Sequence, residues 1–187
     1  MAPVSNSFAA LPEQANMARI PPVPLHALPE DLALAIERGR ASRMLSTSLP
    51  VQVWAYRPEI AQAWLATLEA MHLRGVLDAR LKELVRLRIA SITSCKACQL
   101  ARKNDAVTDE DIACLNSDHA RFSPAEQAAL RYAELFVGDY MSIDDGVFNN
   151  LKHHFSLPEV VELNLFCAMM LAGGRMTYVQ QAYEDPP

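Results

Sequence analysis

Cys95 and Cys98 form a Cys-x-x-Cys motif inside the segment SITSCKACQLARKN, residues 91–104. A thiol reacts as its thiolate, so a reactive cysteine needs a neighbour that lowers its pKa. Thr93 or Ser94 can cap a helix that begins at Cys95, which would place both sulfurs near unpaired N–H groups and the positive end of the helix dipole. The three-residue offset also allows the two sulfurs to form a disulfide. Such a pair can attack a peroxide, form a sulfenic acid and resolve it internally.

Basic residues follow the dithiol. Arg102 lies four residues after Cys98, one helical turn along the same face, and Lys96 and Lys103 add positive charge. Arginine does not exchange protons near neutral pH, but it can hold a thiolate or bind an anionic substrate by a forked contact.

Glu83 is the second residue with chemical potential, because it lies in the apolar segment ARLKELVRLRIASI. An unpaired carboxylate there is costly and tends toward a raised pKa, which suits proton transfer at neutral pH. The structural alternative is a salt bridge to Arg86 or Lys82. From the residues alone this alternative is favoured, because structural ion pairs also perturb carboxylates.

The elements that position these residues are expected to be helices. Helix starts are indicated at Pro29-Glu30-Asp31, at Pro58-Glu59, at Asp78 and at Ser123-Pro124-Ala125-Glu126. The helix after Asp78 is apolar on most sides and is expected at the centre of the fold. Further helices are predicted at 109–116, 123–137, 144–153 and 157–172. No run alternates apolar and polar residues long enough to indicate a strand, so the sequence predicts an all-α single domain.

One predicted helix has a clear apolar periodicity. After Pro58, the spacing of Ile60, Trp64, Leu68 and Met71 predicts a single buried face. Residues 1–29 carry six prolines and little periodicity, and are predicted to be an irregular arm that packs on its own subunit or on a neighbour. Disorder explains the first fifteen residues at least as well. The helical domain is expected to span residues 30–187.

Composition excludes several classes of partner and location. The 187 residues are 51% hydrophobic and carry a net charge of −5, which argues against nucleic acid as the main partner. The most apolar stretch, residues 160–174, contains Glu162 and Asn164 and is too short to cross a bilayer. The first twenty residues do not resemble a secretory signal. Four cysteines in a chain this long are not a disulfide scaffold, which favours a reducing, cytoplasmic location.

A zinc module is an alternative use of the cysteines. The pattern C-x2-C-x15-C-x4-H runs from Cys95 and Cys98 to Cys114 and His119, within plausible ligand spacing. Helices on both sides of the intervening stretch argue against it, and we expect no metal. Cys114 and Cys167 are instead predicted to be buried, inert thiols. No Gly-rich phosphate loop is present, so no organic cofactor is expected.

The segment LKELVRLRIASITSCKACQLAR resembles the core motif of the carboxymuconolactone decarboxylase and alkylhydroperoxidase D superfamily. That motif is a Glu in an apolar helix, a Cys-x-x-Cys, and a His four residues after the second Cys. Glu83 precedes Cys95 by twelve residues, as in the family, and the resemblance extends over most of residues 45–183. The chain departs from the motif at Arg102, which stands where the family's peroxidases have His.

The resemblance implies an alkylhydroperoxidase D-like helical bundle that reduces hydroperoxides. Cys98 corresponds to the attacking thiol, Cys95 to the resolving thiol and Glu83 to the proton-relaying acid. An external dithiol would restore the pair, and the subunits would form a trimer or hexamer. The family's other activity, a lyase acting on a small carboxylated lactone, is the alternative. Its best support is Arg102 as a carboxylate anchor, and the dithiol argues against it.

Overall fold

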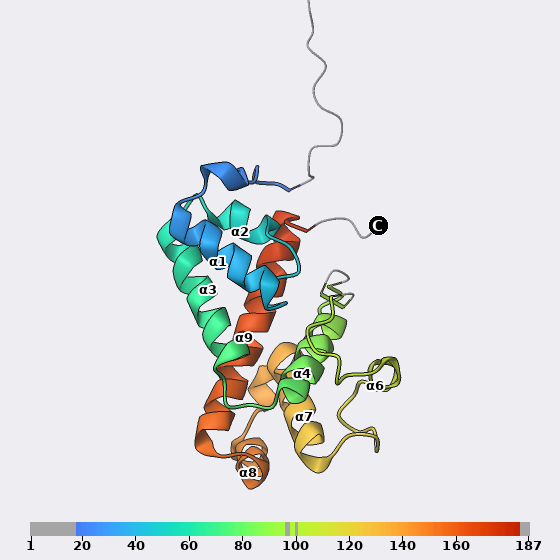
Figure 1. Ribbon diagram of the computed structural model, residues 1–187. Helices are drawn as coiled ribbons and strands as arrows, with labels where there is room; N and C mark the ends of the chain where they lie inside the picture. The colour runs from blue at the N-terminus through green and yellow to red at the C-terminus, as the bar shows by residue number, and fades with distance from the viewer. Residues whose placement is uncertain (1–17, 96–97, 100, 184–187) are drawn as a thin grey trace, which may run out of the picture.

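The computed structural model describes residues 18–95, 98–99 and 101–183 (Figure 1). None of these residues lies in a strand, and the all-α single-domain prediction is confirmed. The elements are η1 (Leu25–Ala27), α1 (Glu30–Ala41), α2 (Leu49–Trp54), α3 (Pro58–Leu73), α4 (Ala79–Ile92), α6 (Asp109–Ala113), α7 (Pro124–Gly138), η2 (Tyr140–Ser142), α8 (Asp145–His154) and α9 (Leu157–Gln180).

The helices form two groups that share α9. The helices α1, α2 and α3 lie together at one end, while α4, α7 and α8 pack at the other (Figure 1). Helix α9 runs past both groups. Its C-terminal end is fixed to α2 by the indole N–H of Trp54, which donates to Gln180 Oε1 at 3.0 Å. The dithiol segment follows α4, which is therefore the element that positions the site.

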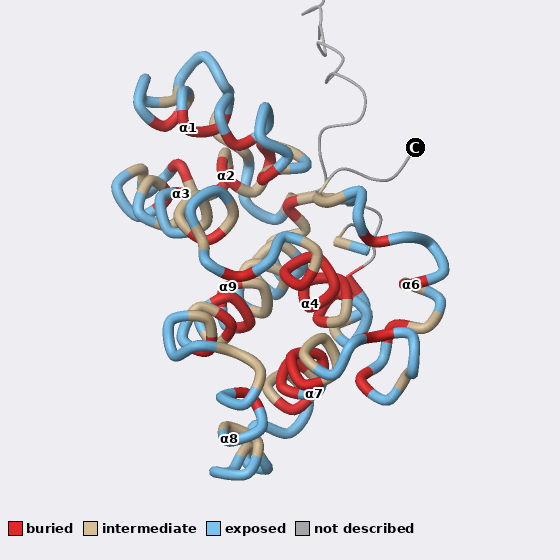
Figure 2. The backbone as a smooth tube through the Cα atoms, turned by 60° about the horizontal axis from the view of Figure 1, so that its bottom comes forward, coloured by how far each residue is buried: buried red, intermediate tan, exposed pale blue. Residues whose placement is uncertain are grey.

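Helix α4 is the most enclosed element of the bundle, as the sequence predicts (Figure 2). The Asp78 side chain caps it by accepting from the backbone N–H groups of Arg80 and Leu81. Nine of its fourteen residues are buried, including the charged Lys82, Glu83 and Arg86. Lys82 is satisfied by the Met71 carbonyl, 2.7 Å away.

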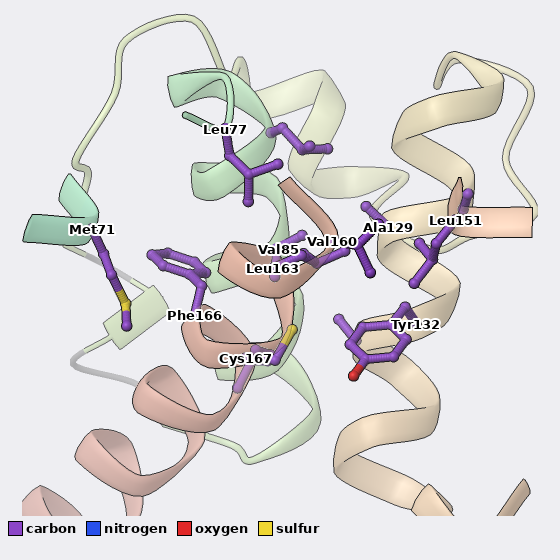
Figure 3. Close-up of a cluster of buried hydrophobic side chains, with 14 of the residues drawn as sticks. Met71, Leu77, Val85, Ala129, Tyr132, Leu151, Val160, Leu163, Phe166 and Cys167 are labelled. Atoms are coloured by element: carbon purple, nitrogen blue, oxygen red, sulfur yellow. The ribbon is translucent and has the colours of Figure 1, made fainter. Parts of the chain in front are cut away.

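The main core lies where α4, α7 and α9 meet, and Figure 3 shows its side chains. Val85 of α4, Ala129 and Tyr132 of α7, and Leu163 and Phe166 of α9 are each at most 2% exposed. A second cluster joins α1, α2 and α3, and contains Leu32, Ile36, Val51, Ala61 and Leu65. The second cluster joins the N-terminal helices into one group, of which α3 packs against α9.

The structure corrects the predicted buried face of α3. Ile60 is 56% exposed, whereas Ala61 and Leu65 are each 1% exposed. The buried stripe is therefore shifted by one residue in the first turns, because α1 packs against α3 from that side. Trp64 and Leu68 are half-buried at the edge of the stripe.

Helix α9 is longer than predicted, because it continues through Gly173-Gly174 to Gln180. Contacts from distant residues hold its last turns, including the Arg19 backbone N–H on the Gln180 carbonyl at 2.8 Å. At 24 residues, α9 is long and apolar enough to cross a membrane by length and composition alone, so the length argument against a span is wrong. Its inner face nevertheless forms the core, and Glu162 pairs with Lys82 of α4.

The described part of the N-terminal arm packs on its own chain. Ala18 contacts a small apolar cluster of α2 and Ala182, and the Val23 N–H donates to the Gln52 carbonyl at 3.1 Å. Residues 1–17 lie outside the described residues. The domain boundary at residue 29 stays a prediction.

Candidate dithiol site

Helix α4 ends in a Schellman motif, which positions Cys95 at the site. The Cys95 N–H donates to the Ala90 carbonyl at 3.0 Å and the Ser94 N–H to the Ser91 carbonyl at 3.2 Å. Ser94 adopts the left-handed conformation, with φ of 55°, at the position where glycine is usual. Thr93 therefore ends α4, its hydroxyl donating to the Ile89 carbonyl at 2.8 Å, and does not cap the helix that follows.

Cys95 and Cys98 are joined by a disulfide, with Cα atoms 5.3 Å apart. The Gln99 N–H donates to the Cys95 carbonyl at 3.0 Å, so one helical turn begins at Cys95 as predicted. Cys95 is 8% exposed, whereas Cys98 is half-buried. Cys98 is thus the more exposed residue of the pair.

Glu83 lies beneath the dithiol segment and is paired with Arg86. Arg86 Nε donates to one carboxylate oxygen at 2.7 Å and Nη2 to the other at 2.8 Å, with Glu83 2% exposed. The Lys103 backbone N–H adds a third bond at 2.9 Å. This is the structural salt bridge that the residues alone favoured. Glu83 is not one of the described residues that line the adjoining pocket.

Arg86 connects this ion pair to the backbone of the dithiol segment. Its Nη1 donates to the Cys98 carbonyl at 2.6 Å and its Nη2 to the Ala101 carbonyl at 2.5 Å. The guanidinium therefore fixes the backbone on both sides of the turn that holds Cys98. Glu83 in turn fixes the guanidinium, so the pair is a buried clamp on the dithiol.

The expected position of Arg102, one helical turn beyond Cys98, is wrong. Residues 101–104 are not helical, because Arg86 captures the Ala101 carbonyl that a continuing helix would use. Arg102 Nη2 instead binds Asp109 of α6 at 2.7 Å, at the surface. Arg102 is not among the described residues that line the pocket. Lys96 lies outside the described residues.

A mostly apolar cavity of about 190 Å³ opens against the disulfide. Both cysteines line it, and the walls come from four parts of the chain: the loop before α2, α2 with α3, α4 with its following loop, and α9. The apolar lining includes Met44, Leu45, Val51, Trp54, Trp64, Leu68, Ile89, Met169 and Met170. Polar groups are few, and the ionisable ones, apart from the two cysteines, are His72, Arg86, Lys103 and Tyr183.

The structure places His72, in the last turn of α3, in the pocket wall. Its Nδ1 lies 3.0 Å from the Leu68 carbonyl, so this nitrogen carries the proton and Nε2 is the acceptor of the neutral ring. Burial lowers the pKa of His72, and the positive charges of Lys103, Lys82 and Arg86 lower it further. His72 is spaced four residues from Leu68 and eight from Trp64, a signal that could have placed it on the same face.

Lys103 enters the pocket from the segment that follows the dithiol. Its ammonium donates to Ser46 Oγ. Burial lowers its pKa from 10.5 to about 8, and the like charge of Arg86 adds to this shift while Glu83 opposes it. Among the residues that the structure describes, no carboxylate pairs with this amine. The sequence indicated positive charge here, but not that the side chain lines a pocket.

The residues of the zinc alternative do not gather. No group of three or more His, Cys, Asp or Glu side chains within the described ranges could hold a metal ion. His119 is occupied locally, its Nδ1 accepting from the Arg121 N–H at 3.2 Å. Cys167 is buried, which raises its pKa to about 12, whereas Cys114 is only half-buried, contrary to prediction.

Residues 58–135 match the family model of the carboxymuconolactone decarboxylase family. This range begins at the first residue of α3 and includes Glu83 and both cysteines of the site. Over these residues the chain is similar to the carboxymuconolactone decarboxylase family, as the resemblance of the motif predicts. No curated protein sequence matches it.

Solved structures share the fold of this chain at low sequence identity. An uncharacterized peroxidase-related protein from Ralstonia eutropha JMP134, with an alkylhydroperoxidase AhpD core, is 20% identical at a TM-score of 0.71, over 92% of this chain and 94% of its own. Another from Silicibacter sp. TM1040 is 14% identical at 0.73, over 93% and 95%. A cysteine variant of the debrominase Bmp8, in complex with 2,3,4-tribromopyrrole, is 14% identical at 0.72, over 91% and 92%.

Proposed function

We propose that the protein is a dithiol peroxidase-like enzyme that reduces organic hydroperoxides. The observation that carries the proposal is the disulfide between Cys95 and Cys98 at the wall of an apolar pocket, with Cys98 the more exposed residue. The family match of residues 58–135 and the fold shared with a structure that has an alkylhydroperoxidase AhpD core support it.

In the reduced protein, the Cys98 thiolate attacks the terminal oxygen of the hydroperoxide. The O–O bond breaks, the alkoxide leaves and takes up a proton to become an alcohol, and Cys98 becomes a sulfenic acid. The Cys95 thiol then attacks the Cys98 sulfur, a disulfide forms and the hydroxyl leaves as water. An external dithiol reduces the disulfide by exchange, which restores both thiols.

His72 is the pocket group best suited to move the proton. Its neutral ring can take the Cys98 proton at Nε2 and return it to the leaving alkoxide, the function of a general acid–base. Glu83 has less support as a relay, because its carboxylate already accepts from Arg86 and from the Lys103 backbone. Its proposed part is to position the dithiol through Arg86.

The lyase alternative has lost its main support from the sequence. Arg102, the expected carboxylate anchor, pairs with Asp109 outside the pocket. Release of carbon dioxide from carboxymuconolactone, at a rate that Cys98→Ser does not change, would favour the lyase over the peroxidase.

The proposal is tested by consumption of cumene hydroperoxide with dithiothreitol as reductant. We expect Cys98→Ser to lower turnover at least about 1,000-fold, because the nucleophile is gone. His72→Gln should lower it about 100-fold through loss of proton transfer. Cys95→Ser should accumulate a sulfenic acid at Cys98, detected by dimedone labelling and mass spectrometry.

The matched control is Cys114→Ser, which removes a half-buried thiol outside the pocket and should leave turnover unchanged. Wild-type turnover in the Cys98→Ser variant would end the peroxidase proposal.

A further inference from the structure

Lys103 brings an excess positive charge into the pocket. Its neighbours Glu83 and Arg86 neutralise each other as an ion pair, and the nearby His72 is neutral at pH 7 because its pKa is lowered. The half-buried Lys103 has the exposed Ser46 hydroxyl as the hydrogen-bond partner of its ammonium, and no described carboxylate pairs with it. An ammonium without an ion-pair partner at the edge of a mostly apolar pocket favours binding of an anion.

The cavity is far too large and too apolar for hydrogen peroxide. Its volume of about 190 Å³ exceeds the cavity of about 150 Å³ that holds benzene in a protein core. Trp54 of α2 and Trp64 of α3 line it, with ring centroids 5.9 Å apart in an edge-to-face arrangement. Aromatic walls of this kind fit a flat or cyclic hydrocarbon group.

We propose that Lys103 and Ser46 bind the carboxylate of an aromatic or cyclic acid hydroperoxide, whose hydrocarbon part lies against Trp54 and Trp64. The inference rests on the proposed function for its reactive group, and on the pocket alone for the binding of the acid. Anchoring the carboxylate beside the dithiol segment would orient the peroxide toward Cys98.

The preference for an acid depends on pH in a defined direction. Below a pKa of about 8, Lys103 is an ammonium and attracts the carboxylate; as pH rises through about 8, the charge and the preference are lost. The charged or titratable groups that interact with it are Glu83 and Arg86 of α4, which form an ion pair with each other, and His72 of α3. The ratio of rates for acid and ester removes the separate pH dependence of the thiolate.

The experiment compares para-carboxy cumene hydroperoxide with its methyl ester at pH 6.5 and pH 9.5. We expect wild-type protein to prefer the acid about 10- to 100-fold in kcat/KM at the lower pH. Lys103→Met should lose the preference while still reducing the ester, and Lys103→Arg should restore part of it. Lys152→Met, an exposed lysine of α8, is the matched control and should behave as wild type.

A binding measurement separates this inference from the proposed function. Trp54 and Trp64 are the only tryptophans and both line the pocket, so the fluorescence of the oxidised protein reports binding of para-isopropylbenzoate and its methyl ester. Tighter binding of the acid that disappears in Lys103→Met, without hydroperoxide turnover, would support the acid site and refute the peroxidase. Hydroperoxide turnover without any preference for the acid would support the peroxidase and refute the acid site. If Lys103→Met lowered kcat/KM equally for the acid and the ester and left binding of the acid unchanged, Lys103 would act on the Cys98 thiolate and not on the substrate. That result would overturn the inference.

Discussion

At the scale of single residues, the Glu83–Arg86 pair shows how a charge serves the site without touching it. Arg86 is 6% exposed. Besides pairing with Glu83, its guanidinium N–H groups donate to the carbonyls of Cys98 and Ala101. Glu83→Gln would leave that guanidinium buried without a counter-charge. We therefore predict that it lowers the free energy of unfolding by about 3–5 kcal/mol, measured by urea denaturation of the oxidised protein.

The control for this prediction is Glu69→Gln. Glu69 lies 3.9 Å from the exposed Arg38, so its loss should cost less than about 0.5 kcal/mol. If the two variants were equally stable, the clamp would contribute nothing. A Glu83→Gln protein of wild-type stability but low turnover would instead favour the proton-relay role that the family resemblance implies.

At the scale of elements, the end of α4 decides where the dithiol lies. Ser94 takes the left-handed conformation that completes the Schellman motif, at a cost that glycine does not have. Ser94→Gly should raise the free energy of unfolding by about 1 kcal/mol, measured by thermal or urea unfolding. Ser91→Gly, at an exposed helical position of α4, should lower it by about 0.5 kcal/mol. If both substitutions changed the free energy of unfolding in the same direction, this account of the α4 terminus would be wrong.

At the scale of the whole molecule, α9 presents an apolar outer face with no covering element among the described residues. Leu157, Val161 and Leu165 are 67%, 58% and 54% exposed, and the exposed Ala168, Ala172 and Val179 continue the stripe at helical spacing. The spacing of three and four residues along one face is that of helices that pack on identical helices. We propose that a second copy of this chain covers the stripe, which gives the predicted homo-oligomer a surface.

Leu165→Glu tests that surface, since a carboxylate in an apolar interface is costly. We expect the variant to have a lower molar mass by light scattering than wild type at equal concentration. Leu34→Glu, at an exposed leucine on α1, should leave the mass unchanged. A monomeric wild type at all concentrations would remove the oligomer, whereas the trimer or hexamer and the cytoplasmic location stay predictions.

The helical class, the starts of α1, α3, α4, α7 and α8, the central place of α4 and the family resemblance could all be predicted from the sequence. These depend on caps, periodicity and motif spacing, which act within a few residues of the chain; the Asp78 cap is an example. The Glu83–Arg86 pair was also foreseen as an alternative, because its partners are three residues apart on one helix.

The surroundings of the dithiol, in contrast, could not be predicted from the sequence. Ser46 and Lys103 are 57 residues apart, and the pocket combines α2, α3, the α4 loop and α9, so local patterns carry no information on their meeting. Whether Arg102 lies on the same face as Cys98 depends on whether the helix after Cys95 continues. The Arg86 side chain, from α4, binds the Ala101 carbonyl, and Arg102 pairs with Asp109 instead. The chemistry of the motif is thus local, while its access, charge and substrate space arise from contacts between segments that are distant in the sequence.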